Sequence, residues 1–204
     1  QIGDEAMFEK PNPNYFVIQK HYPTYLHLPD KGGRLTYWQR AGRLNPSGLL
    51  NAGMSASLVR DDYIWQSLFA YDVWLKRDDR QECTLVIDME GFSLSMLTPT
   101  MLRIFSLSYS TIQKHLPDRE HLVVIVNAPE WWGAIWAVFK PLLPLRQQQK
   151  LRVGTGREES LFALKDVLDL ESIPKEYGGT GIPLGSAPAE RMRRKYATEG
   201  NAKR

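Results

Sequence analysis

Two acidic residues, Asp88 and Glu90, directly follow the apolar stretch CTLVI and could do chemistry. In α/β enzymes, acidic residues just after a strand act as nucleophiles or as magnesium ligands. A phosphatase of the haloacid type would carry an Asp-x-Asp pair at this place, whereas this chain reads Asp-Met-Glu-Gly. We find no second acidic or lysine cluster after a later strand-like segment. We therefore expect Asp88 to brace the turn before Gly91, and keep a phosphatase-like site as the alternative.

The segment GTGREES at 154–160 is a second candidate, because a glycine-rich loop before a helix can hold a phosphate. It lacks the regularly spaced glycines and the Lys-Ser/Thr ending of a phosphate loop. Glu158 and Glu159 suit the positive end of a helix dipole and would repel a phosphate. The chain also lacks GxSxG, HExxH and paired CxxC motifs, and its four histidines are scattered. We expect no catalytic residue, no metal and no cofactor.

The elements that would position these residues alternate between strands and helices. Strand-like segments are expected at 34–42, 83–90, 121–128 and 150–153. Helical spacing or helix-forming composition covers 55–77, 99–115 and 160–170. Strands that are apolar on both faces and alternate with helices of ten or more residues predict a largely parallel sheet covered by helices. The predicted fold class is α/β.

A tryptophan-rich segment, NAPEWWGAIWAVFKPLLP, follows the third of these strands. One helical stripe, at spacing i, i+3, i+4 and i+7, holds Trp132, Ile135, Trp136 and Phe139. A second apolar stripe beside it contains Trp131, so the helix is apolar all round and must be buried or meet lipid on one side. At about nine residues it is too short to span a bilayer. We hypothesise a mobile gate helix whose inner stripe lines a ligand cavity and whose rings meet the membrane on opening. The alternative is an ordinary core helix.

The charge is unevenly distributed along the chain. Residues 187–204 hold six basic and two acidic residues, a net charge of +4, while the whole chain carries +3. The preceding residues therefore sum to −1, which argues against a basic nucleic-acid-binding face on the body. We expect a flexible, solvated basic tail over 181–204, with contact to anionic lipid or RNA as the alternative.

The remaining bulk features suit one domain in a reducing compartment. The 204 residues match a single domain. No apolar run reaches the roughly 18 residues of a membrane span. The single cysteine excludes an internal disulfide framework, so we expect a cytoplasmic protein. The PNPN stretch predicts an irregular linker over 1–20, a remnant of an N-terminal helical region. Because the chain begins at Gln1, we expect it to be cut from a longer protein.

An ordered series of motifs resembles the CRAL-TRIO family of lipid-binding domains, which includes phosphatidylinositol transfer proteins. The series runs IDMEGFS, IQKHLPDREHLVVIVNAPEWW, FKPLLP, QKLRV and LFALKDVLDLESIPKEYGG, and HYPTYLHLPDKGGRLTYWQRAG resembles the family's opening segment. The resemblance covers 21–180. It implies a bowl-shaped α/β domain whose sheet floors a deep apolar cavity closed by a mobile helix. It also implies a non-enzymatic protein, peripheral at membranes, that extracts one lipid and transfers or presents it.

The resemblance also implies an inositol-phosphate region. Lys150 matches the lysine that approaches the inositol phosphate, and Asp118 matches an acidic position tied to inositol-lipid binding. Gln147 stands where such members carry threonine, so that part of the site is altered.

The choline-headgroup region of the family is altered further. Tyr37 and Tyr71 match tyrosines that line it, but a third tyrosine position holds Leu26. The hydroxyl pair that holds phosphocholine falls on Cys83 and Leu85, which cannot replace two strong donors. Phosphatidylcholine is therefore disfavoured, phosphatidylinositol stays an option, and a less polar lipid is open.

We expect the cavity to be lined by Tyr37, Tyr71, Leu85, Ile87, Trp132, Trp136 and Phe139. A regulatory lipid-sensing domain, in which lipid occupancy signals to a partner protein, is the alternative function.

Overall fold

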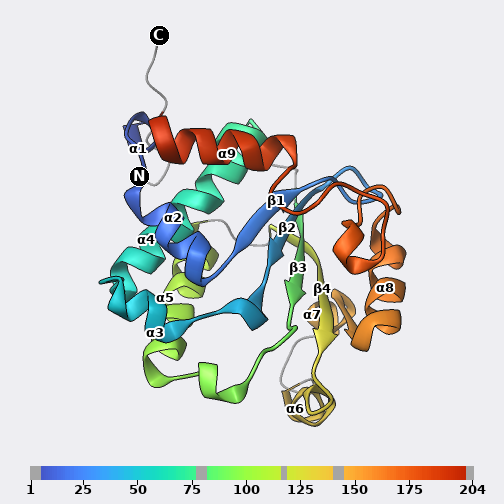
Figure 1. The fold of residues 1–204 in the computed structure, drawn as a ribbon. Coiled ribbons are helices and arrows are strands. Elements are labelled where there is room, and N and C mark those ends of the chain that lie inside the picture. Colours follow the sequence, from blue (N-terminus) through green and yellow to red (C-terminus); the bar gives the residue numbers. More distant parts are fainter. Residues whose placement is uncertain (1–5, 77–81, 116–118, 140–144, 201–204) are drawn as a thin grey trace.

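A five-stranded sheet forms the centre of the molecule in a computed structural model that describes residues 6–76, 82–115, 119–139 and 145–200 (Figure 1). The strands are β1 (Thr24–His27), β2 (Leu35–Gln39), β3 (Cys83–Asp88), β4 (Glu120–Ala128) and β5 (Leu151–Thr155). They lie side by side in chain order. β1 pairs antiparallel with β2, and all the other pairs are parallel. The prediction of an α/β fold with a mostly parallel sheet is confirmed.

Helices lie on both sides of the sheet (Figure 1). Those before β4 are α1 (Ala6–Glu9), α2 (Pro13–His21), α3 (Pro46–Asn51), α4 (Ala56–Leu68) and α5 (Pro99–His115), with a π-helical turn at Phe69–Trp74. Those after β4 are α6 (Trp132–Phe139), α7 (Leu145–Gln149), α8 (Gly156–Val167) and α9 (Pro188–Glu199). None of the helices in the described ranges has the length and apolar character needed to cross a membrane.

Local sequence signals explain where several helices begin. Asn12 and Asn45 each precede a proline, and each side chain accepts a backbone N–H of the first helical turn. Such a cap satisfies a donor that the helix leaves unpaired, and proline suits the first helical position. Ser55 caps α4 in the same way, through the backbone N–H of Leu58.

The two faces of the sheet are covered differently. Trp38, Val86 and Val124 align across the sheet and pack under α8 in one fully buried core cluster. On the opposite face, α4 and the π-helical turn pack against Leu35 and Tyr37 near the β1 edge. α5 lies beside α4 and closes a further cluster with α2 and α3. The centre of that second face is less tightly covered.

Both segments that were predicted to be irregular contain packed helices within their described residues. The expected linker over 1–20 contains α2, whose Tyr15 and Ile18 are buried. The expected flexible tail over 181–204 contains α9, which packs beside β1 and α2. Both predictions are wrong for the described residues, because each segment has an apolar face that the fold buries.

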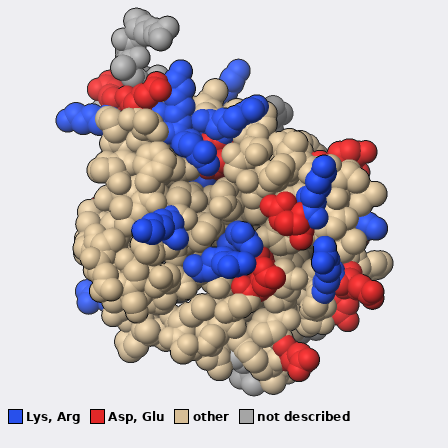
Figure 2. Space-filling view, viewed as in Figure 1, with Lys and Arg blue, Asp and Glu red and all other residues tan. Residues whose placement is uncertain are grey.

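The positive charge near the end of the chain is therefore held on a helix. α9 buries Ala189, Glu190, Arg193 and Ala197, and exposes Arg191, Arg194 and Lys195. Figure 2 shows several Lys and Arg side chains around α9 at the top of the view, next to a group of acidic side chains, and both signs of charge are also mixed farther down. β1, which was not predicted, adds an antiparallel edge beside α9.

Candidate functional site

Two rows of side chains, all half-buried except the buried Ile125, cross the second face of the sheet. The strand register aligns Tyr37, Leu85, Val123 and Leu151 in one row, and Gln39, Ile87, Ile125 and Val153 in the next. We call these eight residues, with Cys83, the inner face. In β3 the exposure alternates: Cys83, Leu85 and Ile87 are half-buried, while their neighbours Thr84, Val86 and Asp88 are buried. A central strand of a covered sheet is normally buried on both faces, so this apolar surface is available for a further contact.

The tryptophan helix packs at one end of the inner face. Trp131 and Trp132 contact the cluster of Met89, Ile125 and Ala128, and the Trp131 ring lies 6.2 Å from that of Phe92 between centroids. Both tryptophans, one from each predicted apolar stripe, therefore contribute to packing. The indole N–H of Trp132 is buried and lacks a hydrogen-bond partner in the described structure.

The second half of α6 is less defined. Trp136 is half-buried. The side chains of Phe139 and Gln147, and all of Asp118, lie outside the described residues. Their roles stay predictions.

Tyrosine hydroxyls gather at the β2 side of the inner face. Tyr22 donates to Gln39 Oε1 at 3.2 Å, and Tyr37 donates to Gln66 Oε1 at 3.2 Å. Burial raises the pKa of both phenols, although both side chains are half-accessible. A phenol on the outer surface would stay hydrated and keep its ordinary pKa. Tyr22 and Tyr37 are thus surrounded by protein but not fully covered by it. This combination is typical of side chains that face an internal space, here in front of the sheet.

The amino-terminal ends of β3, β4 and β5 add polar groups next to Cys83. The Tyr71 hydroxyl lies 3.3 Å from both the Cys83 sulfur and the Arg119 carbonyl oxygen. The Arg119 guanidinium lies 5.6 Å from the centroid of the Tyr71 ring. Lys150 donates to the Glu120 carbonyl oxygen at 2.5 Å. Burial raises the pKa of the Glu120 carboxyl, and Lys150 opposes this shift. Arg119, Lys150 and the Glu120 carboxyl thus stand at this end of the sheet, where Glu82 also pairs with Arg34.

Cys83 is a poor donor in this setting. Burial raises the pKa of its thiol to about 11, partly offset by the Tyr71 hydroxyl. Thiols are weak donors in any case. The expectation that Cys83 and Leu85 cannot supply two strong hydroxyl donors agrees with their placement on the inner face.

Asp88 is a structural residue. One carboxylate oxygen accepts the Tyr177 hydroxyl at 2.7 Å and Arg40 Nε at 3.4 Å. The other accepts Asn127 Nδ2 at 2.8 Å and the Glu90 backbone N–H at 3.0 Å. These contacts saturate the buried carboxylate, so the predicted bracing role is confirmed. Within the described ranges, His, Cys, Asp and Glu side chains form no group of three or more that could hold a metal ion.

The GTGREES segment is a helix start. The Glu159 carboxylate accepts the Thr155 backbone N–H at 3.0 Å, so the protein's own acid occupies the amino-terminal end of α8. Hydrogen bonds from the Thr155 hydroxyl and from the Thr155 backbone N–H lower the pKa of Glu159. The prediction of an ordinary helix start is confirmed.

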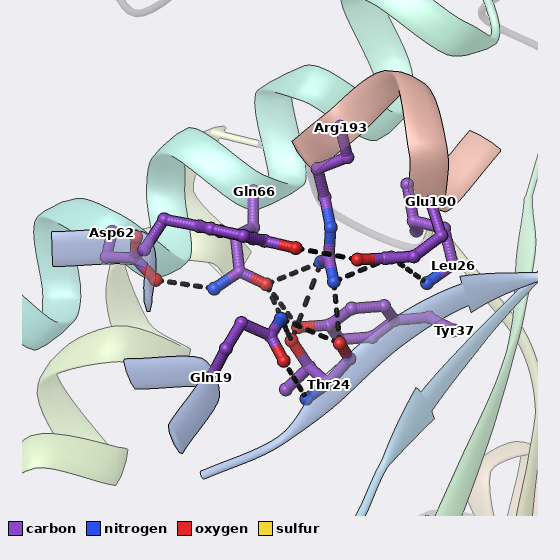
Figure 3. Close-up of polar contacts among 9 residues, drawn as sticks. Gln19, Thr24, Leu26, Tyr37, Asp62, Gln66, Glu190 and Arg193 are labelled. Carbon is purple, nitrogen blue, oxygen red and sulfur yellow. Dashed lines mark hydrogen bonds and ion pairs between the residues drawn. The ribbon is translucent and has the colours of Figure 1, made fainter. Parts of the chain in front are cut away.

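A buried polar network lies behind Tyr37, and the sequence analysis missed it (Figure 3). Gln66 Oε1 accepts Tyr37 OH, Thr24 Oγ1 at 2.8 Å and Arg193 Nη1 at 2.6 Å. Arg193 also pairs with Glu190 at 2.8 Å, and both side chains are completely buried. α9 is thereby joined through Gln66 to a residue of the inner face. The only signal in the sequence was the Glu-x-x-Arg spacing within an alanine-containing helical face.

The model of one protein family, described as the CRAL/TRIO domain, matches residues 19–179. The chain belongs to the CRAL/TRIO family. The match includes the whole sheet and both rows of the inner face, and α9 lies beyond it.

Curated relatives share about a quarter of their residues with this chain. A CRAL-TRIO domain-containing protein of Caenorhabditis elegans is 24% identical over 177 residues, covering 79% of this chain and 40% of its own. The SEC14 cytosolic factor of Candida glabrata is 26% identical over 171 residues, covering 80% and 55%. A phosphatidylinositol/phosphatidylcholine transfer protein of Arabidopsis thaliana is 25% identical over 174 residues, covering 80% and 27%. The chain thus spans between about a quarter and just over half of these relatives.

The crystal structure of Sfh5 shares the fold. It superposes with a TM-score of 0.54 at 16% sequence identity, covering 71% of this chain and 51% of that one. Together with the family match, this assigns the five-stranded sheet and its helices to the CRAL/TRIO fold.

Proposed function

We propose that the protein binds a single lipid against the inner face and transfers or presents it between membranes. The observation that carries this proposal is the half-buried apolar surface of Leu85, Ile87 and Val123 at the centre of the sheet. Acyl chains laid on this surface would remove it from water, at about 25 cal/mol for each Å² of apolar area. The names of the SEC14-type and phosphatidylinositol/phosphatidylcholine transfer relatives support the same reading.

The headgroup would face the polar ends of the strands. Lys150 is the proposed phosphate partner if the lipid is a phosphoinositide, because it stands at the start of β5 and is half-buried. Asp118 and Gln147 belong to the same proposed region. Phosphatidylcholine is disfavoured, since Cys83 and Leu85 occupy the places of its two hydroxyl donors. A less polar lipid needs fewer hydrogen-bond donors and suits the β2 side of the inner face, where the tyrosine hydroxyls gather.

We further propose that α6 is the gate. Its first turn packs on Ile125 and Ala128, so displacing it in water would expose two large indole rings, those of Trp131 and Trp132. Opening against a bilayer would place those rings among acyl chains instead. The protein would then act in the cytoplasm and bind membranes transiently.

Lipid loading tests the proposal. Native mass spectrometry of the purified protein should show one bound lipid per chain. A Leu85→Trp variant should reduce loading at least tenfold, because the larger ring occupies the inner face. Leu170→Trp, at an exposed leucine after α8, is the matched control and should load normally. Equal loading of a folded Leu85→Trp variant would refute lipid binding at this face.

A regulatory lipid-sensing domain is the second candidate, favoured by the length of the relatives. The C. elegans and C. glabrata proteins have about half or more of their chains outside the matched region. Lipid occupancy would then alter binding to another domain or partner. A full-length protein whose partner affinity is the same with and without lipid, while vesicle transfer is rapid, would favour transfer over sensing.

A further inference from the structure

Tyr63 lies on α4, on the turn that precedes Gln66. It is half-buried, while its helix neighbours Asp62 and Ile64 are buried. Burial raises the pKa of the Tyr63 phenol well above its ordinary value, and the phenols of Tyr37 and Tyr22 raise it further. Gln66, which follows Tyr63 by one turn of α4, accepts the Tyr37 hydroxyl, so this turn of the helix lies against the β2 side of the inner face.

The hydroxyl of Tyr63 differs from the other phenols of this region. Tyr22, Tyr37 and Tyr71 each have an acceptor within 3.3 Å for the phenolic O–H. In the described structure the Tyr63 hydroxyl has no such partner, and it is not among the occluded polar atoms. An accessible, desolvated donor of this kind is therefore suited to a ligand atom.

The charges around Tyr63 restrict what that atom can be. Besides the two phenols, the groups that act most strongly on it are the Glu120 carboxyl and the Cys83 thiol. Each of these four groups is either neutral or negative, so none can neutralise an anion. Lys150 acts on Glu120, and Arg119 acts on Tyr71, at the amino-terminal ends of the strands. A phosphate beside Tyr63 would be desolvated without a counter-charge, which is strongly unfavourable.

An uncharged oxygen meets no such penalty. A phenolic O–H can donate to a lipid hydroxyl or to an ester carbonyl, and the phenol oxygen can accept from a hydroxyl in return. The apolar row of Leu85 and Val123 beside Tyr37 would hold the hydrocarbon attached to that oxygen.

We propose that Tyr63 is a ligand-binding residue that donates a hydrogen bond to an uncharged oxygen, a hydroxyl or a carbonyl, of the lipid on the inner face. This inference rests on the proposed lipid-binding function. It separates the inner face into an uncharged subsite at Tyr63 and a charged end at Lys150.

The test uses the Tyr63→Phe variant, which removes only the hydroxyl. Transfer is measured between phosphatidylcholine vesicles doped with diacylglycerol, with dialkylglycerol or with phosphatidylinositol. The first has ester carbonyls and a hydroxyl, and the second has the hydroxyl alone. Loss of one hydrogen bond of about 0.5–1.5 kcal/mol predicts a roughly 2- to 12-fold reduction for the diacylglycerol. Tyr196→Phe, a half-buried phenol on α9, is the matched control and should transfer normally.

The outcomes separate the sources and the hypotheses. If Tyr63→Phe reduces transfer of the dialkylglycerol as well as of the diacylglycerol, the contact is with the lipid hydroxyl. If it reduces transfer of the diacylglycerol alone, the contact is with an ester carbonyl. Transfer within twofold of the wild type for every lipid, or a loss confined to phosphatidylinositol, overturns the inference. A wild-type protein that carries none of the three lipids would instead count against the proposed function. Tyr63→Phe should also keep the lipid-free melting temperature, because no protein hydrogen bond is removed.

Discussion

Replacing Arg193 by methionine should strongly destabilise the protein. Its guanidinium pairs with Glu190 at 2.8 Å and donates to Gln66 and to the Thr24 carbonyl oxygen at 2.6 Å each. It also lies 5.3 Å from the centroid of the Tyr15 ring. Methionine keeps much of the apolar stem but leaves the Glu190 carboxylate buried without its counter-charge.

The expected cost is set by that stranded carboxylate. Removing one partner of a buried ion pair costs about 3–5 kcal/mol. Glu190 keeps the Tyr15 hydroxyl at 2.6 Å and the Leu26 backbone N–H at 2.9 Å, which places the value toward the lower end. At a urea slope of about 2 kcal/mol per molar, the unfolding midpoint should fall by roughly 1.5–2 M.

Equilibrium urea unfolding, followed by tryptophan fluorescence and circular dichroism together, measures this change. Arg194→Met is the matched control: the residue is exposed on the same helix, and its change should stay within about 0.5 kcal/mol. The double variant Glu190→Gln with Arg193→Met should recover part of the loss, because it strands no charge. A loss below about 1 kcal/mol for Arg193→Met would refute the view that α9 is held by this ion pair.

Three further predictions concern the ligand, the gate and pH. Replacing Trp132 and Trp136 by alanine should slow lipid exchange between vesicles, and unchanged exchange by the folded variant would reject α6 as a gate. Lys150→Glu should lower phosphatidylinositol loading at least tenfold with little effect on an uncharged lipid; intact loading would reject its role as phosphate partner. His27 is buried with both ring nitrogens unpaired in the described structure, and burial lowers its pKa to about 4. Folding favours the neutral form of the His27 side chain. The contribution of this side chain to stability is therefore complete above about pH 6.5 and declines as the pH falls toward 4. His27→Phe should therefore gain stability relative to the wild type between pH 6.5 and 4, measured by urea unfolding; a pH-independent difference would contradict this.

The sheet could be predicted because its signal is local. The segments around Val86 and Val124 are apolar on both faces, which is typical of covered parallel strands. β1 was missed, since Thr24–His27 is short and its pairing with β2 depends on a turn and on the tertiary fold. Short strands of this kind carry little periodicity to detect.

The packed ends were missed for a different reason. The charge of 187–204 suggested solvation, yet Arg193 is the residue that holds α9 in place. Its burial depends on Gln66 and Thr24, which are far away in the sequence, so composition alone could not indicate it. Tyr63 lies within the predicted helical range 55–77 but could not be singled out, because an unpaired hydroxyl becomes visible only when its surroundings are known.

The packing of α9 also brings the two ends of the described chain together. The Asn12 backbone N–H donates to the Ala197 carbonyl oxygen at 2.9 Å. Gly200 has a left-handed φ of 68°, and a Cβ there would lie 2.3 Å from the Glu9 carbonyl oxygen, so the two segments touch through their backbones. A short glycine-rich linker can therefore join them without strain. The chain is then suited to circular permutation, with new termini at an exposed turn such as Gly53, and with the native core retained.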